Sequence, residues 1–204
     1  MNRPAHAAAV IAALLAATAT LAAPATIDDV RASLKATTTM TAAFTQTAAN
    51  GTTLTGKLLL ARPGKIRFQY DKAPLLVVAD GKRLSVVDYE VAQVSQWPIK
   101  STPLGVLLDG DADLARYAHV SGVVANGVLV EARDTNHPEY GAITLVFARD
   151  AAAPGGLSLT GWTSLDAQNN RTEVALSDVR YNVAVAGSNF AFRDPRSHGL
   201  PGKN

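Results

Sequence analysis

One polar segment of the sequence carries the types of side chain that bind metal ions or transfer protons. Asp134, His137 and Glu139 fall within six consecutive positions, and Tyr140 follows them. Two carboxylates and an imidazole are zinc ligands, so the segment offers a site for a metal-dependent hydrolase. Catalytic zinc normally has three well-placed protein ligands, however, and Pro138 gives the segment the character of a turn between strands. We therefore predict a polar loop here, with no metal and no cofactor.

Other stretches that could support catalysis are incomplete. The acidic stretch 109–113 resembles part of a calcium loop but lacks the later bidentate glutamate, and helix capping explains it better. Ser158 stands between Gly156 and Gly161, which is the wrong glycine spacing for a nucleophile elbow. The chain has four histidines, and one of them, His6, lies in the N-terminal apolar region. We predict no catalytic residues.

A strictly alternating stretch after a Pro-Gly turn gives the strongest structural signal. Ile66, Phe68 and Tyr70 must share one face of a strand, because successive side chains of a strand point to opposite sides. The polar residues between them occupy the other face, which is typical of an antiparallel sheet with one wet side. The apolar face contacts either an ordinary protein core or a bound lipid, and periodicity alone favours the core.

Short runs of this kind recur between turn residues, which is typical of an antiparallel all-β domain. The Asn-Gly or Asp-Gly pairs at 50–51, 80–81 and 126–127 are strong hairpin signals. The predicted strands span residues 42–47, 53–61, 65–70, 75–79, 83–88, 91–96, 118–124, 127–133, 142–148, 157–165 and 171–179, with a last one near 190–192. So many consecutive strands with one apolar face tend to curl, so we expect a mainly β fold, an incomplete antiparallel β-barrel made of a strongly curved sheet.

Two short amphipathic helices are expected beside the strands. Thr26 and the acidic residues after it resemble a capping box, and the apolar spacing predicts a helix to about Ala36. A Thr-Pro pair at 102–103 favours a second helix start, alone or paired with a segment at 112–117. Three leucines then fall on one face of it: Leu104, Leu107 and Leu108. We expect these helices to cover the mouth of the curved sheet as a lid.

The N-terminal region, residues 1–25, looks like a secretory signal peptide. Arg3 precedes an apolar run at 7–17, which is shorter than the roughly 20 residues of a membrane span, and small residues follow. Cleavage after Ala22 and cleavage after Ala25 both fit, and we expect residues 26–204 to form a single exported domain. The chain has no cysteine, so the exported form would have neither a lipid-bearing cysteine nor a disulfide.

The charge of the chain is nearly balanced. Lys and Arg number 19 and Asp and Glu number 17, for a formal net charge of +2. The basic residues form no dense block and have no aromatic stacking platform beside them. This composition argues against a nucleic-acid partner.

The order and spacing of several motifs over the mature chain resemble the LolA family of periplasmic lipoprotein carriers. In chain order the motifs are Phe44-Thr45-Gln46, the strand from Arg62-Pro63 to Tyr70, Val78-Ala79-Asp80-Gly81-Lys82, Val91-Ala92-Gln93-Val94, Thr102-Pro103 with its leucines, Asp166-Ala167-Gln168-Asn169, and Phe190-Ala191-Phe192 with Pro195. The resemblance implies an incomplete barrel closed by a helical lid around a hydrophobic cavity that accepts acyl chains.

The resemblance also implies which residues meet the cargo. In the family, the arginine at the place of Arg62 ties the sheet to the lid. We expect the cavity to be lined by Leu34, Met40, Ile66, Phe68, Tyr70, Leu104, Leu107, Leu108, Leu145 and Phe147. The implied partners are acylated lipoproteins, an inner-membrane ABC transporter that releases them and an outer-membrane receptor similar to LolB. The implied compartment is the periplasm, where we expect a monomer.

Two positions depart from the family pattern. Ile66 stands where the family often has a large aromatic residue, and Ser85 stands near a family tryptophan. Smaller lining residues would give a roomier cavity and a changed cargo preference. Two alternatives remain: a related periplasmic protein that binds another lipid or senses lipoproteins, and the metal-dependent hydrolase built on Asp134, His137 and Glu139.

Overall fold

The computed structural model describes residues 23–102, 104–108, 117–166 and 168–197. Side chains are described for these residues except those of 106 and 107. The predicted signal up to Ala22, the acidic stretch 109–113 and most of the possible helical partner at 112–117 lie outside the described residues. No helix among those residues is long and apolar enough to cross a membrane.

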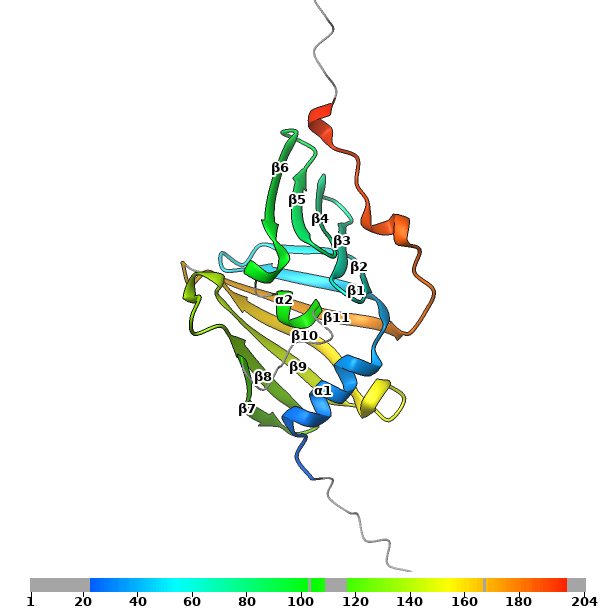
Figure 1. Ribbon diagram of the computed structural model, residues 1–204, viewed down its shortest axis with the longest axis vertical. Helices are drawn as coiled ribbons and strands as arrows, with labels where there is room; N and C mark the ends of the chain where they lie inside the picture. The colour runs from blue at the N-terminus through cyan, green and yellow to red at the C-terminus, as the bar shows by residue number, and fades with distance from the viewer. Residues whose placement is uncertain (1–22, 103, 109–116, 167, 198–204) are drawn as a thin grey trace, which may run out of the picture.

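A single antiparallel sheet of eleven strands forms most of the fold (Figure 1). The strands are β1 (Thr39–Ala48), β2 (Thr53–Ala61), β3 (Lys65–Tyr70), β4 (Leu75–Asp80), β5 (Arg83–Asp88), β6 (Gln93–Pro98), β7 (Ala118–Val124), β8 (Gly127–Arg133), β9 (Ala142–Arg149), β10 (Leu157–Leu165) and β11 (Arg171–Tyr181). Their order across the sheet is β6-β5-β4-β3-β2-β1-β11-β10-β9-β8-β7. Strands that follow one another in sequence therefore pair, except β6 and β7, which lie at the two edges of the sheet. β1 pairs with β11 and so joins the two halves.

Most strand predictions are confirmed within one to three residues, including the turns at 50–51, 80–81 and 126–127. Local turn chemistry and alternation suffice for such hairpins. The strand predicted at 91–96 begins two residues later, because Asp88 accepts hydrogen bonds from the backbone N–H groups of Glu90 and Val91 and so closes a turn. The mainly β prediction is confirmed as one antiparallel sheet with short helices.

Helix α1 (Ile27–Ala36) starts as the sequence predicts. Thr26 and Asp29 form a reciprocal capping box, in which the Thr26 side chain accepts from the Asp29 N–H and Asp29 accepts from the Thr26 N–H. Val30 is fully buried and Leu34 nearly so, and both face the sheet. Helix α2 (Leu104–Leu108) is half as long. The 3-10 helices are η1 (Ile99–Ser101), η2 (Pro138–Tyr140), η3 (Pro154–Gly156), η4 (Gly187–Phe190) and η5 (Pro195–Ser197).

The two faces of the sheet bury two separate apolar clusters. On the face that we call the inner face, the strands pack against α1 and α2 and form the larger cluster. On the outer face of β4 and β5, a smaller cluster contains Leu76, Val78, Val87 and Phe190. β4 and β5 therefore bury side chains on both sides. On β3, by contrast, buried Ile66 and Phe68 alternate with the partly exposed Arg67.

The strand predicted near Phe190–Phe192 is wrong. Phe190 ends the 3-10 helix η4 and packs against the outer cluster, with 4 % of its surface exposed. Arg67 donates hydrogen bonds of 3.0 and 3.1 Å to the carbonyl oxygens of Asn189 and Ala191. In a strand these carbonyl groups would pair with a neighbouring strand, but here the Arg67 guanidinium binds them. The C-terminal segment runs across the outer face (Figure 1).

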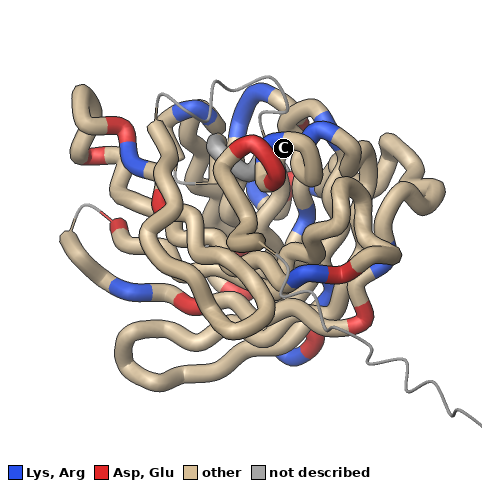
Figure 2. The backbone as a smooth tube through the Cα atoms, turned by 90° about the horizontal axis from the view of Figure 1, so that it is seen from below, with Lys and Arg blue, Asp and Glu red and all other residues tan. Residues whose placement is uncertain are grey.

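Charged residues are distributed over the whole described chain. Lys and Arg are interspersed with Asp and Glu in Figure 2 rather than gathered in one region. This distribution agrees with the near balance of charges in the sequence.

Candidate functional site

The predicted lining residues come together on the inner face. Eight of the ten are buried members of the inner cluster, and Leu104 packs against it while partly buried. The eight are Leu34, Met40, Ile66, Phe68, Tyr70, Leu108, Leu145 and Phe147. Leu107 lies within α2, but its side chain is outside the described part. Residues from α1, β1, β3, α2 and β9 thus share one apolar region. Alternation predicted the shared face on β3, and the family resemblance implied the wider set.

An aromatic group within this region contains two residues that the sequence analysis missed. Phe44 lies edge-on to Phe68 and to Tyr70, with ring centroids 5.3 and 5.2 Å apart. Trp162 lies edge-on to Phe68 at 5.9 Å. Phe44 belongs to a motif that carries the family resemblance. It shares a face of β1 with Met40 and Ala42, at every second position, and this spacing could have revealed it.

Tyr70 is the polar member of this group. Its hydroxyl donates a 2.7 Å hydrogen bond to Gln46 Oε1. Burial raises the pKa of Tyr70 to about 12, and the hydrogen bond opposes part of that rise. The phenol therefore stays uncharged at physiological pH and contributes a satisfied hydroxyl to the apolar wall of the inner face.

Between α1 and the sheet, the inner face is filled by the protein's own side chains. A cavity of about 10 Å³ lies between α1 and the sheet, lined by Leu34, Met40 and Phe147 among others. That volume holds about one water molecule at most. Arg62 lines the same cavity, and its guanidinium nitrogens are buried. A ligand larger than a water molecule therefore requires a change of conformation before it can enter between α1 and the sheet.

Helix α2 closes one end of the inner face through Leu108, which is 1 % exposed. The backbone N–H of Gly64, in the turn after β2, donates a 3.1 Å hydrogen bond to the Leu108 carbonyl. Gly105 allows α2 to approach η1 closely, because a Cβ at this position would lie 2.8 Å from the Ile99 carbonyl oxygen. The position of α2 thus depends on a glycine and a backbone contact.

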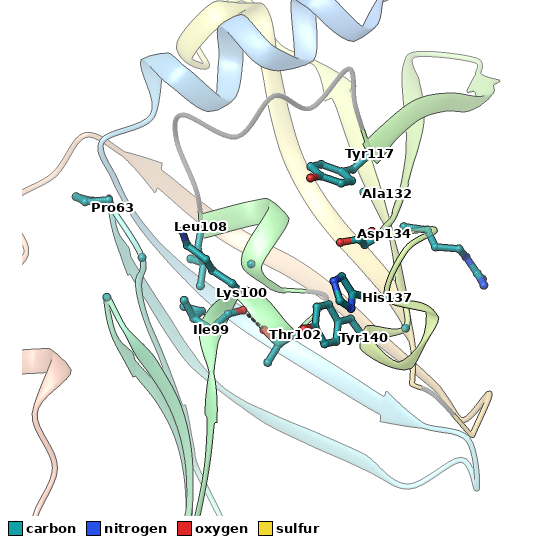
Figure 3. Close-up of a pocket in the computed structure, with 15 residues that line it drawn as sticks. Pro63, Ile99, Lys100, Thr102, Leu108, Tyr117, Ala132, Asp134, His137 and Tyr140 are labelled. Atoms are coloured by element: carbon teal, nitrogen blue, oxygen red, sulfur yellow. Dashed lines mark hydrogen bonds between the residues drawn. The ribbon is translucent and has the colours of Figure 1, made fainter.

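A larger pocket of about 520 Å³ lies beside α2, and we call it the mouth pocket (Figure 3). Its lining comes from the β2–β3 and β4–β5 turns, η1, α2 and the segment 132–141. Leu108 is the predicted lining residue that reaches it. Sequence reasoning singled out Asp134, His137 and Tyr140 as a polar loop but missed the pocket, because its other lining residues lie in turns far apart in the chain that share no motif.

The possible metal ligands do not form a metal site in the described part of the chain. His137 Nδ1 lies 3.0 Å from Glu139 Oε1, and the imidazole stacks on the Tyr140 ring with centroids 4.7 Å apart. Asp134 instead accepts a hydrogen bond from the Asn136 backbone N–H and so closes a turn. No group of three or more His, Cys, Asp or Glu side chains among the described residues is placed to hold a metal.

Ser85 lies on the opposite side of the sheet from the predicted cavity. It pairs with Val78, a member of the outer cluster, and accepts a 2.9 Å hydrogen bond from Gln96. Paired residues of neighbouring strands share a face, so Ser85 does not enlarge the inner face. Ile66, by contrast, is fully buried on the inner face.

A family model described as "Outer membrane lipoprotein carrier protein LolA" matches residues 35–193. The chain belongs to the LolA family. An outer-membrane lipoprotein carrier protein of Chromobacterium violaceum is 31 % identical over 200 residues, which cover 93 % of this chain and 92 % of the relative. A carrier of the same name from Pseudomonas syringae pv. tomato is 28 % identical over 172 residues, which cover 78 % and 79 %. Membership of this family makes the protein a transport protein of a periplasmic family rather than an enzyme.

Two solved structures have a distantly similar chain fold. A LolA superfamily protein from Nitrosomonas europaea has a TM-score of 0.43 at 10 % identity, with 82 % of this chain and 98 % of that chain covered. MucB with MucA from Pseudomonas aeruginosa has a TM-score of 0.46 at 15 % identity, with 85 % and 66 % covered. At these TM-scores the likeness adds nothing about function.

Proposed function

We propose that the protein carries lipoproteins across the periplasm by sheltering their acyl chains between the inner face of the sheet and α2. In this proposal the sheet is an incomplete barrel, and the helices over its inner face are the lid. The observation that carries this proposal is the gathering of the predicted lining residues in one apolar cluster beneath two helices. The alternative hydrolase has no comparable support, because its three residues form no metal cluster in the described chain.

Transfer energies explain why such a cargo needs a carrier. Leaving an acyl chain in water costs about 0.8 kcal/mol for each CH₂ group. A lipid with two or three long chains therefore cannot leave a membrane alone at a useful rate. The closed conformation leaves only about 10 Å³ of space under α1, so loading must displace protein side chains from the inner face.

We infer that α2 is the part that moves. Its Leu108 side chain enters the inner cluster, and Leu104 packs against that cluster. Both are aliphatic, so acyl chains replace them on the inner face without loss of any side-chain hydrogen bond. The buried guanidinium of Arg62 follows β2 and lies beside α1 and, in this proposal, sets how firmly the helical cover is held on the sheet.

The proposed cycle has two protein partners. An inner-membrane ABC transporter would supply the acylated lipoprotein, and an outer-membrane receptor similar to LolB would receive it. The predicted signal peptide, cleaved after Ala22 or Ala25, would deliver the carrier to the periplasm. There it would act as a monomer with no cofactor and no nucleic acid.

Release of a radiolabelled lipoprotein from spheroplasts tests the carrier function. The mature protein should release the lipoprotein into the supernatant as a soluble complex. A photo-reactive benzoylphenylalanine at Leu104, on the inner side, should crosslink to the cargo. The same residue at Val94, which packs with the outer cluster, should not. Cargo that stays in spheroplasts, or that crosslinks equally at both positions, would contradict the proposal.

A further inference from the structure

The mouth pocket combines an apolar floor with a polar wall. Ile99, Leu108 and Ala132 contribute buried side chains to it, and Leu108 also belongs to the inner cluster. Across the pocket, the segment after β8 projects polar side chains toward α2 (Figure 3). The volume of about 520 Å³ lies within the range of roughly 300–1,000 Å³ that suits a small organic group. The pocket therefore fits an amphipathic group whose apolar end points toward the inner face.

The polar wall is held in place by its own backbone. Asp134 accepts from the Asn136 N–H at 2.9 Å, and the Tyr140 N–H donates to the His137 carbonyl at 3.0 Å. Gly141 follows with φ of 78°, and a Cβ there would lie 2.1 Å from the Leu165 carbonyl oxygen. The side chains of this wall are thus presented by a turn with a fixed shape.

The imidazole of His137 is oriented on two sides. Its Nδ1 lies 3.0 Å from Glu139 Oε1, and its ring stacks on Tyr140 at an interplanar angle of 12°. Two hydrogen bonds lower the pKa of Glu139. The larger contribution comes from its own backbone N–H, and the second comes from His137. Glu139 therefore stays ionised and fixes the ring, so that Nε2 remains for a ligand.

The charges around the pocket favour a neutral polar ligand. The Arg133 guanidinium lies 4.0 Å from Glu131 Oε1, so the charges left in the lining are that of Lys100 and, in the polar wall, the Asp134 carboxylate. A phosphate would meet that carboxylate at a cost, whereas ester and amide carbonyls carry no net charge and accept hydrogen bonds. Such carbonyls occur where acyl chains join a lipid-modified N-terminal residue.

We propose that the mouth pocket binds the ester and amide junction of the cargo, with Lys100, His137 and Tyr140 as its polar contacts. This inference depends on the proposed carrier function, because the acyl chains beyond the junction would extend past Leu108 into the inner face. The pocket would thereby distinguish a lipid-modified polypeptide from a free fatty acid.

Binding measurements on the mature protein with three probes test the inference. The probes are a synthetic triacylated lipopeptide, palmitate and a short-chain phosphatidylethanolamine. Lys100→Ala and Tyr140→Phe should each weaken lipopeptide binding about three- to tenfold, as expected for a lost hydrogen bond. Palmitate binding should not change. Asn136→Ala is the matched control, because its side chain is exposed in the same turn and its bond to Asp134 uses the backbone.

The outcomes separate the two proposals. A wild-type protein that binds neither lipopeptide nor palmitate would overturn the carrier function together with the subsite. Lipopeptide binding that is unchanged in both variants would overturn the subsite alone, as would an equal loss for lipopeptide and palmitate. A loss confined to phosphatidylethanolamine would identify a phospholipid site and also overturn it.

Discussion

Helices α1 and α2 both cover the inner face, but they are held there in different ways. Ser33 of α1 donates a buried 2.8 Å hydrogen bond to the Leu157 carbonyl, and Asn182 donates one of 3.1 Å to the carbonyl of Ala36. The tie described for α2 is the backbone bond from Gly64 to Leu108. Side-chain hydrogen bonds to distant segments therefore fix α1, whereas in the described part α2 rests mainly on Leu104 and Leu108.

This difference separates a permanent cover from a removable one. A buried hydrogen bond between side chain and backbone is costly to break, because it leaves an unsatisfied polar group. Apolar contacts can be exchanged for contacts with an acyl chain at little net cost. In the proposed function, α2 is therefore the part that opens while α1 keeps the sheet covered, as a carrier with a reversible lid requires.

Truncation of the apolar cluster at the two helices should give the largest contrast. Phe147 lies beneath α1, and Phe147→Ala should lower the free energy of unfolding by about 3–5 kcal/mol. Leu108→Ala should cost less than the usual 2–5 kcal/mol or so for a buried leucine, because α2 can open locally and thereby limits the loss. Urea denaturation measures both. Equal losses within the usual range would mean that α2 is as firmly held as α1.

The second test removes the buried tie of α1. Ser33→Ala leaves the Leu157 carbonyl without its donor, and we expect a loss of about 1–3 kcal/mol. Hydrogen exchange should quicken in α1 and remain unchanged in α2. The exposed Ser188 provides the control, since Ser188→Ala should alter neither helix. If exchange quickens in α2 instead, the two covers are coupled and the contrast fails.

The parts of the fold that depend on local chemistry could be read from the sequence. The capping box of Thr26 involves neighbouring residues, as does the alternation of buried Ile66 and Phe68 with polar residues along β3. Both are confirmed. Alternation also predicted which side chains of one strand share a face, and the family resemblance predicted which faces come together. It could not show whether that face is empty or filled, because the filling depends on how α1 and α2 settle on it.

The errors arose where distant segments decide the outcome. Phe190 occurs in a stretch with strand-like composition, but Arg67 binds the adjacent carbonyls and the segment forms a 3-10 helix. Ser85 was placed with the cavity by resemblance, although its pairing with Val78 turns it to the outer face. The mouth pocket combines turns whose proximity follows from the strand order alone, so no linear motif could have predicted it.

Acid should loosen α1 through its capping box. Hydrogen bonds from Thr26, first the backbone N–H and then the hydroxyl, lower the pKa of Asp29. A carboxyl with a depressed folded pKa stabilises the fold above its unfolded value of about 3.9, and this contribution is lost as pH falls through the folded pKa. Thr26→Ala should cost about 1 kcal/mol at pH 7.

Asp29→Asn makes the pH test specific. Its stability deficit relative to wild type should shrink as pH falls below about 4, since both proteins then have an uncharged side chain at this position. Hydrogen exchange at several pH values, read separately for α1 and α2, provides the measurement. A deficit that stays constant down to pH 2 would show that the Asp29 charge does not hold α1.

The smallest effect on stability should come from Gly105, where α2 approaches η1. In Gly105→Ala the new Cβ would lie 2.8 Å from the Ile99 carbonyl oxygen, while alanine favours the helix by about 1 kcal/mol. These opposing terms should leave the free energy of unfolding nearly unchanged and shift α2 outward. Binding of bis-ANS and hydrogen exchange in α2 should both rise, with α1 unaffected. Gly187→Ala is the control, because no atom lies within 4 Å of the Cβ it would add. An unchanged dye signal would mean that α2 is held by more than its close contact with η1.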